Sequence, residues 1–598
     1  MVNSYSQMTP LQILLASKSY YTSNHPHEQQ KIRNTLRNTL LTAAQSDYII
    51  FDNMLRNILY YLYAEVLLMN KKTGNPVLAL LTMGMVFAGS AAAFGMSAGS
   101  YDVTVDSVGG PLTVSVTVSE DSIENIEIKE IHDTNGVGDF AAQLLSEEIT
   151  EYQSVNVDGV TGATLTSIFM KNAVKEALKQ AGAEEDAFSE KTEIPAQAQE
   201  DIEADVVVVG GGLAGMSAAM NASVNGMHVV LVERCSYLGG TALVSDQSIF
   251  QSQTEPYLSD WLNMDAAFSE QGINLGLIDY PGFGEKVFVT VPDKEEGTSI
   301  CKYVIDKMAG IAVENGALFL TDTTATGLLT ENGAVTGIIA QPKGQDSFSV
   351  HAKAVILATG GFPNNSDLVN EYLPYAVGAR YIGIGGNKGD ALAWAEEIGA
   401  QTVMLDADVS SFMAVNPNTG FPCSYNYEGN YYIDENGDLI TADHSYNTGA
   451  MEVYKAIGNT KFYTIYPEQY VESQGMGEVF EGVVTSKTAV VCEGLDAVAA
   501  ETGLANVKQT LLDEGCAEDD TYYVMRSISG IYGTYGGLSV DNEGRVQDEN
   551  NEAIPGLYAA GEVIGSLQFQ HSHYYDGGLG PAMCMGYVAG NTAAADIK

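Results

Sequence analysis

Apolar residues in the central part of the chain form two short β-branched runs, separated by a glycine-rich turn and an apolar segment. Asp205–Val209 is long enough for a buried strand and too short for a helix. The Ala-rich segment Ala214–Val224 predicts a helix, and His228–Val232 predicts a second strand. Strand, helix and strand in this order predict the beginning of an α/β domain.

The turn between the first strand and the helix contains Gly210, Gly212 and Gly215 in the pattern G-x-G-x-x-G. The first glycine permits a tight turn, the second lets a pyrophosphate approach the backbone, and the third lets the helix pack on the strand. Glu233 ends the second strand, where its carboxylate can bind the ribose hydroxyls of an adenosine. An ordinary glycine-rich turn is the alternative, but the complete series favours a dinucleotide site. Its candidate residues are Gly210, Gly212, Ala214, Gly215, Glu233, Arg234, Gly239, Gly240 and Thr241.

A smaller unit, residues 101–183, precedes this one. Leu112–Val118 alternates as a strand, and Ile123–Ile131 predicts a second strand. Asp158–Ser167 then opens an amphipathic helix. A Gly-Ala-Thr turn at a helix start is a capped N-terminus, and the free amides there also suit a phosphate. The polar, acidic segment Glu184–Ala204 predicts a linker between the two units.

Composition narrows the class of protein. The 598 residues are 45% hydrophobic and 17% charged, which is typical of globular domains. A formal net charge of −48 excludes nucleic acid as a natural partner and favours solubility in a salty or extracellular setting. The six cysteines contain no C-x-x-C pair, so the sequence predicts no zinc ribbon, no attached haem and no metal site.

Residues 69–93 resemble a secretory signal peptide, although they begin 68 residues into the chain. Met69–Pro76 is basic, Val77–Ala88 is apolar, and Ser90–Ala93 supplies small residues for cleavage. We therefore interpret residues 69–93 as a signal peptide and residues 1–68 as an extension from a wrongly assigned translation start. An uncleaved membrane anchor is the alternative. Either way, the protein is expected to be secreted or anchored on the outer face of the cytoplasmic membrane.

Asp158–Ser167, with Asp133–Asp139 and Gln153–Ser154 before it, resembles the FMN-binding domain in which a flavin transferase esterifies a threonine to FMN. The resemblance implies Thr164 as the attachment residue, with Thr166 as the second choice. A tethered FMN beside a dinucleotide fold suggests that electrons pass between two flavins. A helix cap without a cofactor is the alternative.

The stretch from Asp205 to Lys598 resembles the FAD domain of the fumarate reductase, urocanate reductase and 3-ketosteroid dehydrogenase superfamily. The resemblance rests on Ala352–Phe362, Gly386–Asp390, Gly556–Glu562 and Gly580–Met583. It implies a Rossmann-like domain, residues 205–362 and 516–598, that binds FAD non-covalently. It also implies an inserted α+β capping domain, residues 363–515, behind the small α+β FMN-binding domain. The further cofactor residues it implies are Thr359, Gly360, Gly361, Asp390, Glu562, Gly580, Ala582 and Met583.

Three cationic positions of the dicarboxylate reductases are absent. Leu439 stands where the resemblance places an arginine proton donor, and Gly533 stands where it places a histidine. The carboxylate-binding asparagine–arginine segment is replaced by His573–Gly578. A dicarboxylate buried without these partners would be unpaired at a cost of several kcal/mol. Fumarate is therefore a poor candidate substrate.

His573–Gly578 instead resembles the ketosteroid branch, in which a tyrosine and a glycine amide hold a substrate ketone. The matching pair is Tyr575 with the amide of Gly578, although Asp576 replaces the proline of the motif. Packing against neighbours is the alternative role for any one of these tyrosines. Further candidates for the pocket or for proton relay are Tyr574, Tyr532, Tyr535, His571 and His573.

These features predict a reductase of a carbon–carbon double bond conjugated to a carbonyl group. Hydride transfer to the β-carbon is the chemistry FAD supplies, while a tyrosine and an amide stabilise the enolate. The expected partners are a small unsaturated carbonyl compound, a membrane-associated electron donor and a flavin transferase. The alternatives are a reductase of unsaturated carboxylates that uses Arg526 or Arg380, a ketosteroid-type dehydrogenase, and an electron carrier.

Overall fold

The computed structural model divides into two units, residues 1–90 and 91–598. The structure describes residues 95–598, except for 108, 185, 192–198, 246–248, 253–256, 280–285, 296–297, 382, 407, 416–421, 424–428, 441–460 and 566–577. The predicted signal peptide and the extension before it lie outside these residues. Across the described ranges, none of the helices combines the length and apolar character needed to cross a membrane.

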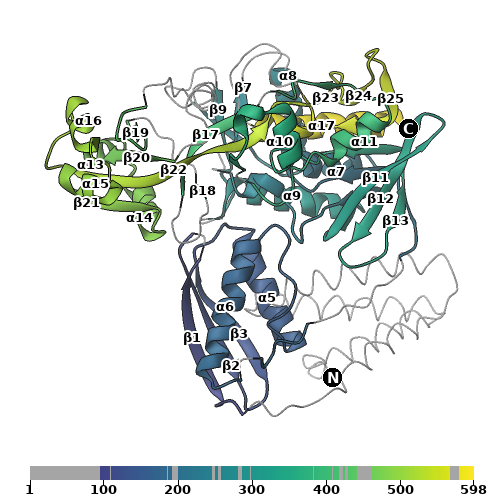
Figure 1. Cartoon of the computed structure of the whole chain (residues 1–598). Coiled ribbons are helices and arrows are strands. Elements are labelled where there is room, and N and C mark those ends of the chain that lie inside the picture. Colours follow the sequence, from purple (N-terminus) through teal and green to yellow (C-terminus); the bar gives the residue numbers. More distant parts are fainter. Residues whose placement is uncertain are drawn as a thin grey trace. The chain divides into compact units, whose positions relative to one another are not determined.

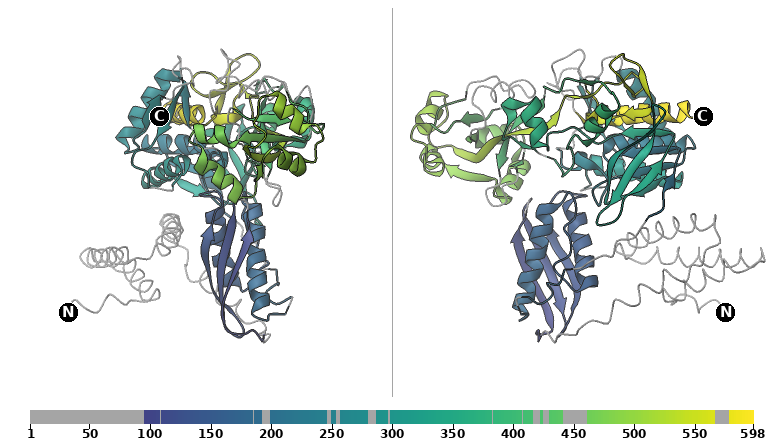
Figure 2. Two further views of the ribbon diagram at one scale, coloured as in Figure 1. Left: turned by 90° about the vertical axis from the view of Figure 1, so that its left-hand side faces the viewer. Right: turned by 45° about the vertical axis from the view of Figure 1, so that its right-hand side comes forward.

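The region expected to bind FMN, called the FMN-binding region below, is an antiparallel sheet with two helices, which Figure 2 shows against one face of the sheet. Its elements are β1 Gly99–Asp106, β2 Pro111–Val118, β3 Ile123–Ile131, α5 Gly138–Tyr152 and α6 Thr164–Gln180. Alternate residues of β2, from Leu112 to Val118, point into the core because successive strand side chains face opposite ways. The two predicted strands are present, whereas β1 and α5 were not predicted.

The region expected to bind FAD, called the FAD-binding region below, is built on a mostly parallel sheet. In spatial order its strands are β10 Leu318–Leu320, β6 Val229–Val232, β5 Val206–Val209, β14 Ala354–Leu357, β25 Ala553–Ala559 and β24 Arg545–Gln547. Every residue of β5, β6 and β14 is buried, as expected for a parallel sheet covered on both faces. Helices α7 Leu213–Val224 and α17 Leu579–Asp596 pack beside the sheet, and α9 Ile300–Glu314 packs against α7. The predicted α/β fold is confirmed.

A second sheet continues the FAD-binding region. It consists of β11 Thr323–Glu331, β12 Ala334–Pro342, β13 Phe348–His351 and β4 Ile202–Glu203. Two short helices, α10 Ser366–Tyr372 and α11 Asp390–Glu397, and the strand β23 Gly537–Leu538 also belong to this region. A small sheet of β7 Phe250–Ser252, β9 Lys286–Thr290 and β8 Gly276–Asp279 lies near α8 Tyr257–Glu270.

The capping region surrounds the long strand β22, Thr521–Thr534 (Figure 1). Its other strands are β17 Asp408–Val415, β18 Pro422–Cys423, β19 Tyr431–Ile433, β20 Phe462–Pro467 and β21 Ala489–Glu493. Its helices are α13 Glu468–Ser473, α14 Gly477–Thr485, α15 Leu495–Thr502 and α16 Val507–Asp513. The first half of β22 pairs with β20 and β21, and the second half pairs with β17 and with β15, Arg380–Tyr381.

Packing crosses both predicted boundaries of the capping domain, at residues 363 and 515. Val369 and Ala391, after the first boundary, belong to the hydrophobic cluster of the FAD-binding region. Tyr522 and Val524, after the second boundary, belong to a cluster of the capping region. At residue 515 the reason is that β22 is shared, because its first half pairs with β20 and β21 and its second half pairs with β17 and β15.

Candidate functional site

The glycine-rich turn after β5 has open space beside Gly212 and close contacts beside its other glycines. A Cβ added at Gly215 would lie 1.8 Å from the Gly210 carbonyl oxygen, and one at Gly210 would lie 2.3 Å from the Ala358 carbonyl oxygen. By contrast, no described atom lies within 4 Å of a Cβ added at Gly212, which is the N-cap of α7. Open space beside a helix N-terminus is what a pyrophosphate requires.

Glu233 is buried directly beside this turn. Its Oε2 accepts a hydrogen bond of 2.6 Å from the Gly211 amide, and its Oε1 accepts one of 2.7 Å from the Cys235 amide. Burial raises the pKa of this carboxyl, while the two amides act in the opposite direction. Each carboxylate oxygen keeps a further lone pair, so the group can also accept from a ribose hydroxyl.

Several predicted residues that are distant in sequence meet near Glu233. The Gly239 amide donates to the Gly211 carbonyl at 2.8 Å, and Thr241 Oγ1 lies 3.1 Å from the Tyr381 hydroxyl. Arg234 Nη2 lies 2.5 Å from Asp390 Oδ2 and forms an ion pair with it. The glycine turn and the Asp390 motif are therefore parts of one site.

Thr359 gives a direct test of whether a cofactor fits. Its Oγ1 is buried and has no hydrogen-bond partner among the described residues. Such a hydroxyl costs about 1–3 kcal/mol when it stays unsatisfied, so a polar group of a ligand is the expected partner. The open space at Gly212 and the unsatisfied hydroxyl of Thr359 are both consistent with a bound FAD, so the residues of this site fit the cofactor.

Glu562 accepts hydrogen bonds from two segments that are distant from it in the sequence. Its Oε1 accepts from the Thr534 amide at 2.8 Å, and its Oε2 accepts from Asn387 Nδ2 at 2.9 Å. Burial raises the pKa of Glu562 to about 7. A Cβ added at Gly361 would lie 2.6 Å from this carboxylate, and one at Gly533 would lie 2.5 Å from it. The second distance gives a physical reason why residue 533 carries no side chain here.

Sequence reasoning missed Asn387 and Thr534 as the partners of Glu562. Asn387 lies within the recognised Gly386–Asp390 motif, and Thr534 begins the Thr-x-Gly-Gly segment, so both motifs contained the signal. What the sequence lacked was any indication that the two motifs meet at one carboxylate. A further link is the Phe362 amide, which donates to Thr534 Oγ1 at 3.4 Å.

Helix α17 crosses α7 at close range. A Cβ added at Gly586 would lie 2.1 Å from the Ala214 carbonyl oxygen. Gly561, before Glu562, approaches both Ala214 and Ala582, since its added Cβ would lie 2.8 and 3.7 Å from their Cβ atoms. Gly580 and Met583 are buried in the first turns of α17. The start of α17 thus lies beside the glycine turn.

The substrate pocket is only partly described. Tyr575, Tyr574, His573 and His571 lie outside the described residues, so their roles stay predictions. Gly578 is the N-cap of α17. Tyr532 and Tyr535 are partly buried on either side of the Gly533–Thr534 pair that contacts Glu562.

Neither of the alternative cationic residues is buried. Arg380 and Arg526 are both exposed, in β15 and β22. Leu439, which occupies the position of the family arginine, packs against a hydrophobic cluster of the capping region that includes Ile433 and Val507. No charged group of residue 439 is therefore available for a substrate.

The two threonines of the FMN motif have different surroundings. Thr164 is exposed and begins α6. Thr166 is only 4% exposed, and its Oγ1 donates to Asp133 Oδ2 at 2.7 Å. Asp133 also accepts from Ser107 Oγ at 2.8 Å and from the Gly109 amide at 3.0 Å. Thr166 thus holds the helix start in place, whereas the Thr164 hydroxyl is accessible.

A cavity of about 550 Å³ lies at Thr164. It is lined by Asp158, Gly159, Val160, Thr161, Gly162, Thr164, Ser167, Ile168, Lys171, Lys343 and Gly385. Free amides at the start of α6 and nearby lysines suit a phosphate group. The residues present therefore fit an FMN joined through its phosphate.

The two sites define a flavoprotein with one enclosed nucleotide site and one at a helix start. Family comparison agrees: residues 205–270 and 259–573 match the FAD binding domain, and residues 108–179 match the FMN-binding domain. Because the first match spans more than half of the chain, the protein belongs to this family of FAD-dependent oxidoreductases, whose members act on carbon–carbon bonds.

The chain is also similar to several known proteins. A urocanate reductase from Eggerthella lenta is 26% identical over 79% of this chain and 89% of its own length. The structure of a flavocytochrome c3 fumarate reductase in an open conformation is similar, with a TM-score of 0.57 at 20% identity, covering 69% of this chain and 84% of that one. A 3-ketosteroid Δ1-dehydrogenase from Sterolibacterium denitrificans gives 0.52 at 21% identity, covering 66% and 100%. The structural matches show a shared fold.

Proposed function

We propose that this protein is an extracytoplasmic flavin-dependent reductase of a carbon–carbon double bond conjugated to a carbonyl, acting on an apolar substrate such as an enone. FAD would be held non-covalently by the glycine turn, Glu233 and Thr359, and FMN would be joined to Thr164. The chemistry the two bound flavins supply is electron transfer to FAD and hydride transfer to the substrate's β-carbon. The predicted signal segment, residues 69–93, supports the location.

The distribution of arginines is the observation that carries the choice of substrate. From residue 95 onward the sequence contains four arginines, at positions 234, 380, 526 and 545. Arg234 is paired with Asp390, and Arg545 is paired with Asp596 through Nε at 2.7 Å and lies 3.3 Å from Asp541. The other two arginines are exposed on strands. A carboxylate in a closed pocket needs a desolvated cationic partner, whereas a neutral ketone needs only hydrogen-bond donors.

The chain's own groups would act on the substrate oxygen and the α-carbon. The hydroxyl of Tyr575 and the amide of Gly578 would donate to the carbonyl oxygen as it gains negative charge. Tyr574 is the second choice for this role, and Tyr532 or Tyr535 would protonate the α-carbon.

Anaerobic reoxidation tests the substrate class. The purified flavinylated protein is photoreduced and mixed with a panel of neutral enones and unsaturated acids, including urocanate and fumarate. We expect the enones to reoxidise the flavins fastest. Faster reoxidation by an unsaturated acid would favour the carboxylate reductase, with Arg380 and Arg526 as the residues to test. Reduction of the oxidised protein by a saturated ketosteroid would favour the dehydrogenase, and no response at all would favour the carrier.

Replacement of Tyr575 with Phe is the sharper test of the site. We expect this change to slow enone reduction about 10²–10³-fold, which is the usual effect of losing one oxyanion donor. FAD content should not change, because the hydroxyl acts on the substrate. Tyr574→Phe is the matched control, and an equal loss in both variants would contradict the assignment of a single donor.

A further inference from the structure

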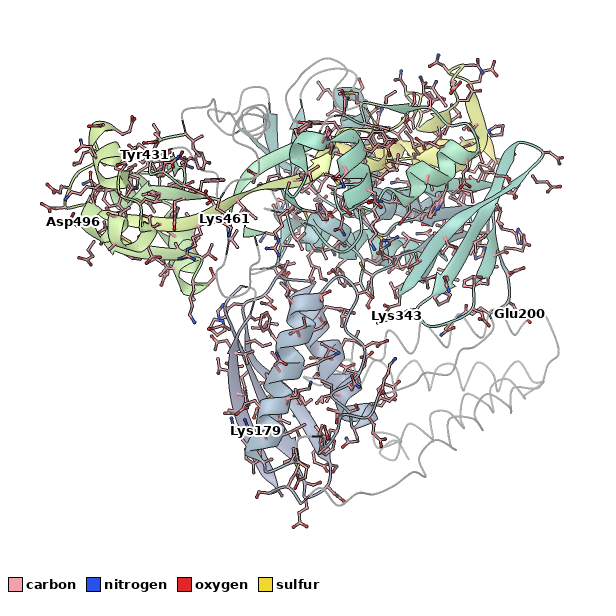
Figure 3. The ribbon with its side chains drawn as sticks, in the orientation of Figure 1. Lys179, Glu200, Lys343, Tyr431, Lys461 and Asp496 are labelled. Atoms are coloured by element: carbon pink, nitrogen blue, oxygen red, sulfur yellow. The ribbon has the colours of Figure 1, made fainter. Side chains whose placement is uncertain are left out.

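The cavity at Thr164 is lined by residues of both flavin-binding regions. Most of its residues precede or begin α6, but Lys343 and Gly385 come from the FAD-binding region. Lys343 lies in the turn between β12 and β13, where Figure 3 labels it at the tip of the hairpin. It is 42% exposed, so its ammonium group remains accessible to a ligand.

Lys343 contacts the segment that leads to Thr164. Its Nζ donates to the Gly159 carbonyl at 3.0 Å and lies 3.7 Å from Asp158 Oδ2. Lys171 is the other lysine of the cavity and shares a helical face with Thr164 and Ile168. Its ammonium group already donates to the Val157 carbonyl. Lys343 is therefore the cation that approaches this turn from outside the FMN-binding region.

A second contact shows how closely the turn packs on the FAD-binding region. A Cβ added at Gly162 would lie 2.5 Å from the Tyr237 hydroxyl oxygen and 3.0 Å from Cys235 Sγ. Tyr237 also packs against Phe140, with 5.9 Å between the ring centroids. Cys235 and Tyr237 follow Glu233, so the FMN turn rests on the same loop that forms the FAD site.

We propose that Lys343 binds the phosphate of the FMN on Thr164, so that both regions of the chain build the FMN site. The proposal rests on the attachment at Thr164 given above. A phosphodiester carries one negative charge, which the helix N-terminus and a neighbouring ammonium group both favour. Because Lys343 is partly exposed, water and salt screen its attraction to the FMN phosphate. We therefore expect Lys343 to favour the phosphate-bound arrangement by at most about fivefold.

Phosphorus NMR of the holoprotein tests this contact directly. Lys343→Gln should shift the ³¹P resonance of the FMN phosphodiester by more than its linewidth, and Lys343→Arg should restore it towards the parent position. Lys179→Gln is the matched control, since it removes the same charge from the last turn of α6, which a rise of about 1.5 Å per residue puts about 22 Å from Thr164. The FAD pyrophosphate resonances should be the same in all variants, which verifies that the protein is folded.

The outcomes separate this inference from the proposed function. Intact-mass analysis of each variant shows first whether FMN is attached, and peptide mapping shows whether it is on Thr164. An FMN on another residue would overturn both proposals. FMN on Thr164 with an unchanged ³¹P resonance in Lys343→Gln, or an equal shift in Lys179→Gln, would overturn the role of Lys343 alone.

Discussion

The two flavin sites differ in how much of the protein surrounds them. At the FAD site, hydrogen-bonded carboxylates and close backbone contacts surround the open space beside Gly212 and the unsatisfied hydroxyl of Thr359. At the FMN site, an exposed threonine begins a helix and faces a cavity. The first site can hold a cofactor by enclosure, whereas the second is more open and would depend mainly on the proposed bond at Thr164.

This difference matches what each flavin is proposed to do. A flavin that receives electrons from an outside donor must be reachable, and a covalent bond keeps it in place without enclosure. A flavin that reduces a substrate benefits from a site without water, where donors act more strongly on developing charge. Variants that remove the FMN attachment or fill the enclosed FAD site test this difference between the two sites.

The largest expected effect is from Thr164→Ala. This change should abolish covalent FMN and, with it, turnover with the physiological donor, while FAD stays bound because its site lies elsewhere. Activity with a small artificial reductant should be retained. Protein mass, flavin fluorescence after denaturation and the two activities measure the effect.

Thr166→Ala is the matched control for the tether. It removes a buried hydroxyl bonded to Asp133, so it should lower stability by about 1–3 kcal/mol while FMN stays attached. FMN still attached to the Thr164→Ala protein would transfer the assignment to Thr166 or contradict the proposed attachment site.

The next effect concerns the enclosure, and it compares two glycines of one motif. Gly215→Ala places a methyl group 1.8 Å from the Gly210 carbonyl oxygen, so α7 cannot pack and FAD should be lost. Gly212→Ala meets no described atom, so the protein should fold as the parent does. It should nevertheless bind FAD more weakly, because the methyl group occupies the space reserved for the pyrophosphate.

Circular dichroism and FAD titration distinguish these cases. Equal FAD affinity in the parent and in Gly212→Ala would show that this space is not the pyrophosphate site. Normal folding and FAD content in Gly215→Ala would show that the tight contact of α7 is not required.

The sequence predicted best where one local pattern determines the structure. The helix expected at Ala214–Val224 is α7, Leu213–Val224, and the first strand is β5, Val206–Val209. Helix α5 was missed, although Asp139 in the quoted FMN motif bonds the Gly136 and Phe140 amides at its start. The partners of Glu562 were missed because Asn387 is 175 residues away, and no short pattern encodes such a contact. The tyrosines of the substrate turn stay predictions.

The smallest expected effect concerns the pH dependence of the enclosed site. Burial raises the pKa of Glu562 to about 7, above its ordinary value of 4.5, so the folded protein binds a proton that the unfolded chain releases. Stability should therefore fall as pH rises from about 4.5 to 7 and level off above that range, by up to about 3 kcal/mol. Glu233, whose pKa is raised in the same direction, adds to this slope in the parent and in any Glu562 variant alike.

Glu562→Gln should flatten this slope, because the amide has no charge to bury. At pH 5 the variant should be the less stable protein, since one amide oxygen cannot replace both acceptors used by the Thr534 amide and Asn387 Nδ2. At pH 8 the difference should shrink or reverse, because only the parent carries a buried negative charge. The midpoint of thermal FAD release, followed by flavin fluorescence, measures the stability difference between the parent and Glu562→Gln at each of the two pH values. Parallel pH profiles for the two proteins would mean that Glu562 is ionised throughout and that its three donors, the Thr534 and Gly361 amides and Asn387, outweigh its burial.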